Sequence, residues 1–232
     1  MIKPHGSDTL GPRYVIDDRE RAALASEAEG LPSLPLNSAA AANAVMLGAG
    51  YFNPLQGYMT LGDAQSVARE LRTESGLFWP VPILNLTDDE SVAPGQRIAL
   101  RDPNVDGHPV IAVMDVTAVE DASSEALTEI AEKVFRTLDP EHPGVATFLS
   151  LGSRVVSGPI DVLGFSYFAS EFPDTFRTAY DIRAEIVERG WKAHVRGEAR
   201  AFESAMAAIE GFRAENPAVS DQFLGEFVVT RD

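Results

Sequence analysis

The chain contains no cysteine. This absence excludes disulfide bonds, thiolate nucleophiles and metal sites with cysteine ligands. No apolar run approaches the roughly 18 residues of a membrane-spanning helix. The first residues, Met1 to Asp8, also lack the apolar core of a secretion signal. We therefore expect a cytoplasmic protein that has no membrane partner.

Basic charge is scarce as well. The chain has 19 lysines and arginines against 35 aspartates and glutamates, which gives a net charge of −16. A nucleic acid would be repelled over most of such a surface, because its phosphates carry the same sign of charge. We therefore expect no nucleic-acid partner.

The common short catalytic motifs are missing. The four histidines are His5, His108, His142 and His194, and no two of them stand at the spacing of a His-x-x-His or His-x-x-x-His pair. Glycine-rich phosphate loops and a Gly-x-Ser-x-Gly elbow are not found either. The residues alone therefore identify no catalytic side chain, no metal site and no cofactor.

What the chain does have is the composition of a globular protein, with 232 residues of which 45% are hydrophobic. Helical and strand patterns alternate along it, and Asp, Pro and Gly turns separate several short strands, as in a small barrel. The pattern predicts an α+β fold. Helices are expected at 18–29, 39–47, 63–71, 125–138, 142–151, 178–189 and 197–216, and strands at 77–86, 97–101, 109–119, 154–165 and 222–230.

Two further features refine this prediction. The segment 31–36 alternates apolar residues with prolines, which is typical of an edge strand or an extended connector. Towards the C-terminus, apolar residues recur at helical spacing from Phe202 to Phe212, and Pro217 would stop the helix. We expect an amphipathic helix there.

Polar and aromatic loops supply the candidate contact residues. Asp139-Pro140-Glu141-His142-Pro143-Gly144 is a rigid loop, because its prolines restrict the backbone. It is either a stiff connector or a binding loop. The aromatic loop 48–59 either anchors itself in the core or forms an interface. The candidates are Lys3, His5, Asp139, Glu141 and His142 in polar loops, with Phe52, Asn53 and Tyr58 in the aromatic loop.

Several motifs occur in an order that resembles the ATP sulfurylase (sulfate adenylyltransferase) family. They run from Lys3-Pro4-His5-Gly6-Ser7-Asp8 through Gly48-Ala49-Gly50-Tyr51-Phe52-Asn53-Pro54, Trp79-Pro80-Val81-Pro82 and Asp139-Pro140-Glu141-His142-Pro143-Gly144 to Arg189-Gly190-Trp191-Lys192. The resemblance covers residues 1–192. It implies the N-terminal PUA-like domain of that family, a pseudo-β-barrel with flanking helices. For residues 193–232, beyond the resemblance, we expect a C-terminal helical extension.

The sequence then departs from the family. There, a nucleotide-binding catalytic domain follows, with a Gln-Thr-Arg-Asn-Pro signature and a His-x-x-His pair that bind nucleotide and sulfate. Here the stretch from Ala193 to Arg200 has neither motif. The remaining residues are also too few for a nucleotide-binding α/β domain. The resemblance therefore implies a PUA-like domain without its catalytic domain, and no activity of this chain alone.

Three functional hypotheses follow. The first is a stand-alone, non-catalytic accessory domain linked to sulfur metabolism, which binds a protein partner or itself and whose C-terminal helix caps the surface that would face a catalytic domain. The second is a contribution to sulfate adenylyltransferase activity together with a separate catalytic subunit. The third is an RNA-binding module, which rests on fold analogy and which the net charge disfavours.

Overall fold

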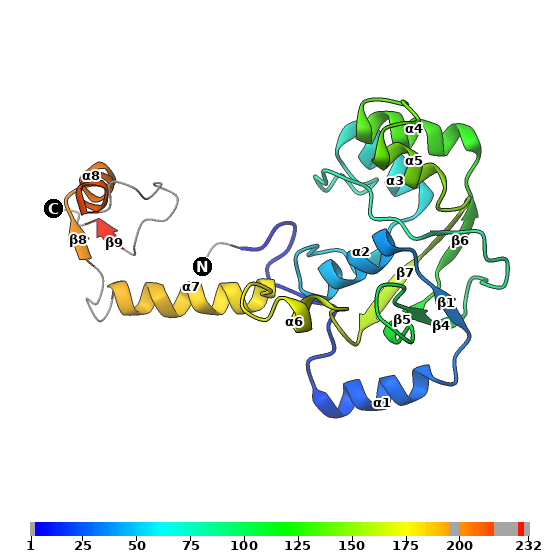
Figure 1. Ribbon diagram of the computed structural model, residues 1–232, viewed down its shortest axis with the longest axis horizontal. Helices are drawn as coiled ribbons and strands as arrows, with labels where there is room; N and C mark the ends of the chain where they lie inside the picture. The colour runs from blue at the N-terminus through cyan, green and yellow to red at the C-terminus, as the bar shows by residue number, and fades with distance from the viewer. Residues whose placement is uncertain (1–2, 195–199, 216–226, 230–232) are drawn as a thin grey trace. The chain divides into compact units, whose positions relative to one another are not determined.

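The computed structural model describes residues 3–194, 200–215 and 227–229 (Figure 1). The chain divides into two compact units, residues 2–179 and residues 180–232. The boundary at 192/193 that the family resemblance implies stays a prediction.

A mixed sheet forms the centre of the first unit. Among its described residues, seven strands form one sheet, with β7 (Arg154–Val162) at its middle. The path β1-β4-β5-β7-β2 is extended by two further strands, β3 and β6, that also pair with β7. The remaining strands are β1 (Ser33–Pro35), β2 (Gly57–Tyr58), β3 (Leu86–Thr87), β4 (Arg97–Arg101), β5 (Val110–Asp115) and β6 (Ala118–Asp121).

The long strand β7 pairs with four strands, and its partner changes between β5 and β6 at a glycine. Its end, 160–162, pairs with β5, and its start, 154–157, pairs with β6. At Gly158 between them φ is +152°, and an added Cβ would lie 2.1 Å from the carbonyl oxygen of Asp115. The prediction of one strand at 109–119 is therefore wrong: the run splits into β5 and β6 where the backbones cross closely.

The predicted strand at 77–86 is also wrong for most of its length. Only Leu86 belongs to a strand, β3. Pro80 and Pro82 lack the N–H groups that a strand ladder needs. The segment still receives single backbone hydrogen bonds, from Met59 to the carbonyl of Ile83 (2.9 Å) and from Val156 to that of Asn85 (3.0 Å).

Helices flank the sheet, and local signals explain their starts. Asp17, Asn37 and Ser123 cap α1, α2 and α4 by accepting hydrogen bonds from backbone N–H groups of the first turns. The left-handed Arg136 (φ +61°) ends α4 earlier than predicted. The helices are α1 (Asp18–Ala28), α2 (Ser38–Gly48), α3 (Leu61–Glu70), α4 (Ser124–Phe135), α5 (Pro143–Leu149) and α6 (Phe168–Glu171).

The core of this unit has a large cluster, a small cluster and a third cluster formed by Ala28, Ala99 and Val113. The large cluster lies between α2 and the sheet and includes Trp79, Met114 and Val162. Helix α2 packs so closely on β7 that a Cβ at Gly48 would lie 2.7 Å from a methyl of Val162. The small cluster includes Leu84, Leu86 and Ile130 and joins the layer of α3, α4 and α5, at one end of the unit, to the sheet (Figure 1).

The second unit contains most of α7 (Ala179–His194), with β8 (Arg200–Phe202), α8 (Ala205–Glu215) and β9 (Phe227–Val229). Strands β8 and β9 pair in parallel. Gly190 was expected to end or bend this helix. It does not end it, because α7 continues to His194. The predicted helix 197–216 is shorter, because β8 occupies part of it; residues 197–199 and 216 lie outside the described residues.

The amphipathic pattern of the C-terminal segment is explained locally. Phe202 of β8 and Phe212 of α8 bring their ring centroids to 5.7 Å, and the guanidinium of Arg200 lies over both rings. Arg200 also pairs with Glu215 at 2.6 Å. No helix in the described part of the chain combines the length and the hydropathy that crossing a membrane requires.

Candidate functional site

Asn53 organises the N-terminal segment. Its side chain is 8% exposed and donates to the hydroxyl of Ser7 (2.8 Å) and to the carbonyl of His5 (3.2 Å). Its carboxamide oxygen accepts a hydrogen bond from the N–H of Gly11 (2.9 Å). The Asn53 side chain thus holds residues 5–11 against the loop that follows α2.

Two other candidates, His5 and Phe52, lie near this anchor. His5 donates from Nε2 to the carbonyl of Phe78 (2.8 Å), since a carbonyl can only accept, and its ring lies 6.1 Å from that of Trp79. Phe52 also packs against Trp79, edge to face, with ring centroids 5.8 Å apart. Lys3 pairs with Asp8 at 2.5 Å on the surface. The structure therefore brings His5, Phe52 and Asn53 together, in a packing arrangement rather than an acid–base one.

Tyr58 belongs to the same core cluster as Trp79, against which Phe52 also packs. Its side chain is 4% exposed in the main core, and its hydroxyl donates to the carbonyl of Ala40 at 2.7 Å. Burial raises the pKa of the Tyr58 phenol far above its ordinary value. Tyr58 is therefore a neutral core residue that joins β2 to α2.

The loop between α4 and α5 forms a third location, and its polar groups bind its own backbone. Asp139 accepts a hydrogen bond from the N–H of Glu141 (2.9 Å) and His142 accepts one through Nδ1 from the N–H of Val145 (3.3 Å). His142 thereby caps α5. Its ring also lies 5.5 Å from that of Phe135, the last residue of α4. These polar groups therefore shape the loop's own backbone, and Glu141 is exposed; a contact role for the loop stays a prediction.

The described residues also form a polar recess, lined by Asp88, Glu90, Asp121, Ser153 and Arg154. Asp88 accepts hydrogen bonds from the N–H and hydroxyl of Ser153, at 2.9 and 3.3 Å. Arg154 lies 3.3 Å from Asp121. Three carboxylates against one guanidinium make this recess unfavourable for an anion such as sulfate. Within the described part of the chain, no cluster of histidines and carboxylates is arranged to hold a metal ion.

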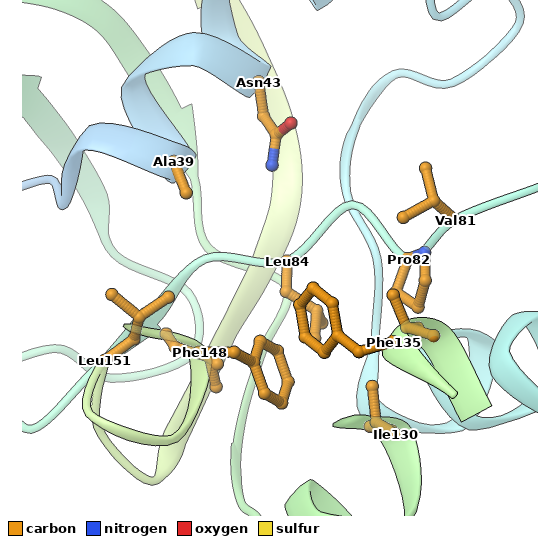
Figure 2. A pocket seen from close by; sticks show the side chains of 11 residues that line it. Ala39, Asn43, Val81, Pro82, Leu84, Ile130, Phe135, Phe148 and Leu151 are labelled. Carbon is orange, nitrogen blue, oxygen red and sulfur yellow. The ribbon is translucent and has the colours of Figure 1, made fainter. Parts of the chain in front are cut away.

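An apolar pocket of about 190 Å³ opens between α2, the segment 81–86, α4 and α5 (Figure 2). Sequence reasoning missed it because its walls come from four separate segments. One signal was present: Asn43 is a lone polar residue in the apolar run of α2. The lining residues are Ala39, Asn43, Val81, Pro82, Leu84, Leu86, Ile130, Val134, Phe135, Phe148 and Leu151.

Comparison with protein families agrees with this architecture. The model of the PUA-like domain matches residues 2–164, which is most of the chain and includes every strand of the large sheet. The chain belongs to the PUA-like domain family. The α+β fold and the PUA-like domain that the motif series implied are confirmed.

Known proteins similar to this PUA-like domain are longer than it is. A sulfate adenylyltransferase of Alcanivorax borkumensis is 62% identical over 192 residues, which cover 82% of this chain and 48% of the relative. One of Allochromatium vinosum is 56% identical over 201 residues, 86% of this chain and 51% of that relative. The chain thus spans about half the length of these curated relatives.

The chain is also similar in fold to solved structures. A hexameric APS kinase from Thiobacillus denitrificans matches with a TM-score of 0.60 at 24% identity, over 94% of this chain and 38% of that one. At this identity the likeness concerns the fold alone.

Proposed function

We propose that this chain is a non-catalytic accessory part of a sulfate adenylyltransferase, which contacts a catalytic part made of other residues. One observation carries the proposal: the chain is 62% identical to a protein named sulfate adenylyltransferase over a stretch equal to 48% of that relative. Identity at this level over 192 residues supports a shared role for the domain, and the link to sulfur metabolism comes from the relative's name.

The geometry of the candidate residues supports the non-catalytic half of the proposal. Transfer of an adenylyl group to sulfate requires cations and hydrogen-bond donors aimed at the charge that develops on phosphate oxygens. In this domain the donors of Asn53 and His5 are directed at the protein's own hydroxyl and carbonyl groups. The polar recess around Asp88 carries mainly negative charge. Neither location offers what an anionic reactant needs.

The proposed partner is a protein in the cytoplasm rather than a nucleic acid. The net charge of −16 opposes binding to a polyanion but leaves local contacts with a protein open. The partner is the half of a sulfate adenylyltransferase that this chain does not match, whether it is joined to the domain or encoded separately. Self-association through the same domain is the second mode of assembly.

The test is an activity assay on the purified chain, with circular dichroism to establish that it is folded. Adenylyl sulfate formation and the reverse, ATP-forming reaction should both stay at background, whereas the full-length Alcanivorax borkumensis relative serves as the positive control. Turnover by the chain alone would overturn the non-catalytic proposal.

A second experiment tests the accessory role. The unmatched half of the Alcanivorax borkumensis relative is mixed with this chain, and co-elution and activity are measured. Complex formation is the expected result, and activity of the mixture would favour the two-subunit enzyme of the sequence analysis. Separate elution with no activity contradicts an accessory role. Sedimentation of each component alone measures self-association.

A further inference from the structure

The apolar pocket lies between the large and the small cluster of the core. Ala39 and Asn43 are four residues apart on α2 and therefore share one face of that helix. Leu84, Leu86 and Ile130 belong to the small cluster and are buried beneath the pocket. The Ala40, Ala41 and Ala44 side chains of α2 lie in the large cluster instead. The pocket is thus bordered by two well-packed regions.

The far wall of the pocket is held in place by the loop that sequence analysis singled out. Phe135 and Phe148 meet with ring centroids 6.2 Å apart. The ring of His142 contacts Phe135 from the loop side, and a Cβ at Gly144 would lie 2.6 Å from the Phe135 ring. A wall fixed in this way needs little ordering when a ligand enters, which lowers the free-energy cost of binding.

The lining of the pocket is almost entirely apolar. All the residues around the pocket are uncharged, although the chain as a whole carries a net charge of −16. Asn43 is the polar exception, and Figure 2 shows its side chain extending from α2 towards Leu84. Within the described residues the Asn43 carboxamide has no hydrogen-bond partner. A mostly apolar site with one polar group is the usual pattern for recognition of a small molecule.

We propose that this pocket binds a small, uncharged, mainly apolar molecule that carries one amide-like or hydroxyl group for Asn43. The volume of about 190 Å³ suits a substituted single ring, because an apolar cavity of about 150 Å³ holds benzene. A charged ligand is disfavoured, since no side chain of the lining would compensate its charge. This inference is independent of the proposed sulfate adenylyltransferase role.

The experiment titrates the isotopically labelled full chain with benzamide, toluene and benzoate by NMR. Benzamide should give saturable shifts for residues of α2, α4 and α5, toluene weaker ones, and benzoate none. Asn43→Leu, which has nearly the same shape, should weaken benzamide about five- to tenfold, the loss of a hydrogen bond, and leave toluene unchanged.

A matched pair of substitutions tests the location. Ala39→Phe places a ring in the pocket and should abolish binding of both probes, whereas Ala42→Phe, at another exposed alanine of α2, should preserve it. If Ala39→Phe lowers the melting temperature, Ala39→Leu is used instead, because it fills the pocket with a smaller side chain. Absence of saturable binding, or binding that survives both Ala39 substitutions, overturns the proposal. One further result would also overturn it. If no probe binds, but Ala39→Phe blocks association with the unmatched half of the relative, the pocket is occupied by a side chain of that protein.

Discussion

The carboxamide of Asn53 donates a hydrogen bond of 2.8 Å to the hydroxyl of Ser7, forty-six residues earlier in the chain. The same side chain also binds the backbone at His5 and Gly11. Asn53, a candidate contact residue on the basis of the sequence, thus holds the N-terminal segment in place through hydrogen bonds. Its three hydrogen bonds explain why an asparagine stands between an aromatic residue and a proline in this loop.

Asn53→Leu is expected to lower the free energy of unfolding by about 2–3 kcal/mol, because three hydrogen bonds are lost at about 1 kcal/mol each. Urea unfolding measures this loss, and hydrogen exchange should show faster opening of residues 5–11. As a control, Asn104→Leu removes one exposed contact with Ser38 and should change stability by about 0.5 kcal/mol or less. Equal effects of the two substitutions would contradict the anchoring role.

Tyr58→Phe should lower stability by about 1 kcal/mol at pH 7, because the buried hydrogen bond to the Ala40 carbonyl is lost. The raised pKa of the folded phenol adds a pH dependence: its stabilising contribution is complete below the ordinary pKa of about 10 and is lost as the pH rises above it. The stability difference between wild type and Tyr58→Phe should therefore shrink above about pH 10. Urea midpoints at two pH values measure it.

The matched control for that substitution is Tyr51→Phe. The Tyr51 hydroxyl donates to the Arg177 carbonyl at 2.8 Å from a side chain that is 41% exposed. Its removal should cost about 0.5 kcal/mol or less at pH 7. A constant difference between wild type and Tyr58→Phe from pH 7 to the alkaline range would refute the buried, neutral phenol.

Arg69 and Glu129 join α3 to α4 through two parallel hydrogen bonds of 2.6 Å. The hydrogen bond from Arg69 lowers the pKa of the Glu129 carboxyl below its ordinary value, so its contribution is present above that value and lost as the pH falls through the folded pKa. Glu129→Gln should therefore be less stable than wild type at pH 7, and urea unfolding at a series of pH values should show this difference shrinking as the pH falls below the ordinary pKa of a glutamate. A difference that stays constant over this range would assign the effect to packing instead.

Gly158→Ala should prevent correct packing of β7, with a loss of about 4 kcal/mol or more, because its Cβ would lie 2.1 Å from the Asp115 carbonyl oxygen. Gly107→Ala is the control: its φ is also positive, at +80°, but nothing lies within 4 Å of the added Cβ. That substitution should cost about 1–2 kcal/mol, the strain of a left-handed alanine. Melting temperature and soluble yield measure both. A mild Gly158→Ala would mean that the strands separate easily there.

Helices were predictable where a short-range signal marks their start. The carboxylate of Asp17 and the carboxamide of Asn37 each bind N–H groups within three residues, so the sequence nearby contains all the information needed. The strand predictions failed where contacts with backbone far away in the sequence determine where a strand ends. Residues 109–119 read as one strand, but the crossing of β7 at Gly158 breaks the run after Asp115.

The sequence by itself determined the family, because an ordered series of motifs survives any local error in assigning helices and strands. The sequence also shows directly that α2 is uncharged and rich in alanine, which favours a helix. It predicts a rigid loop from Asp139 to Gly144, because proline restricts the backbone. Only the tertiary structure decided that Asn53 anchors a segment, that Tyr58 is buried, and that Asn43 and Phe135 line one pocket. Those roles depend on contacts between residues far apart in the chain, and no periodicity or spacing along the sequence records such contacts.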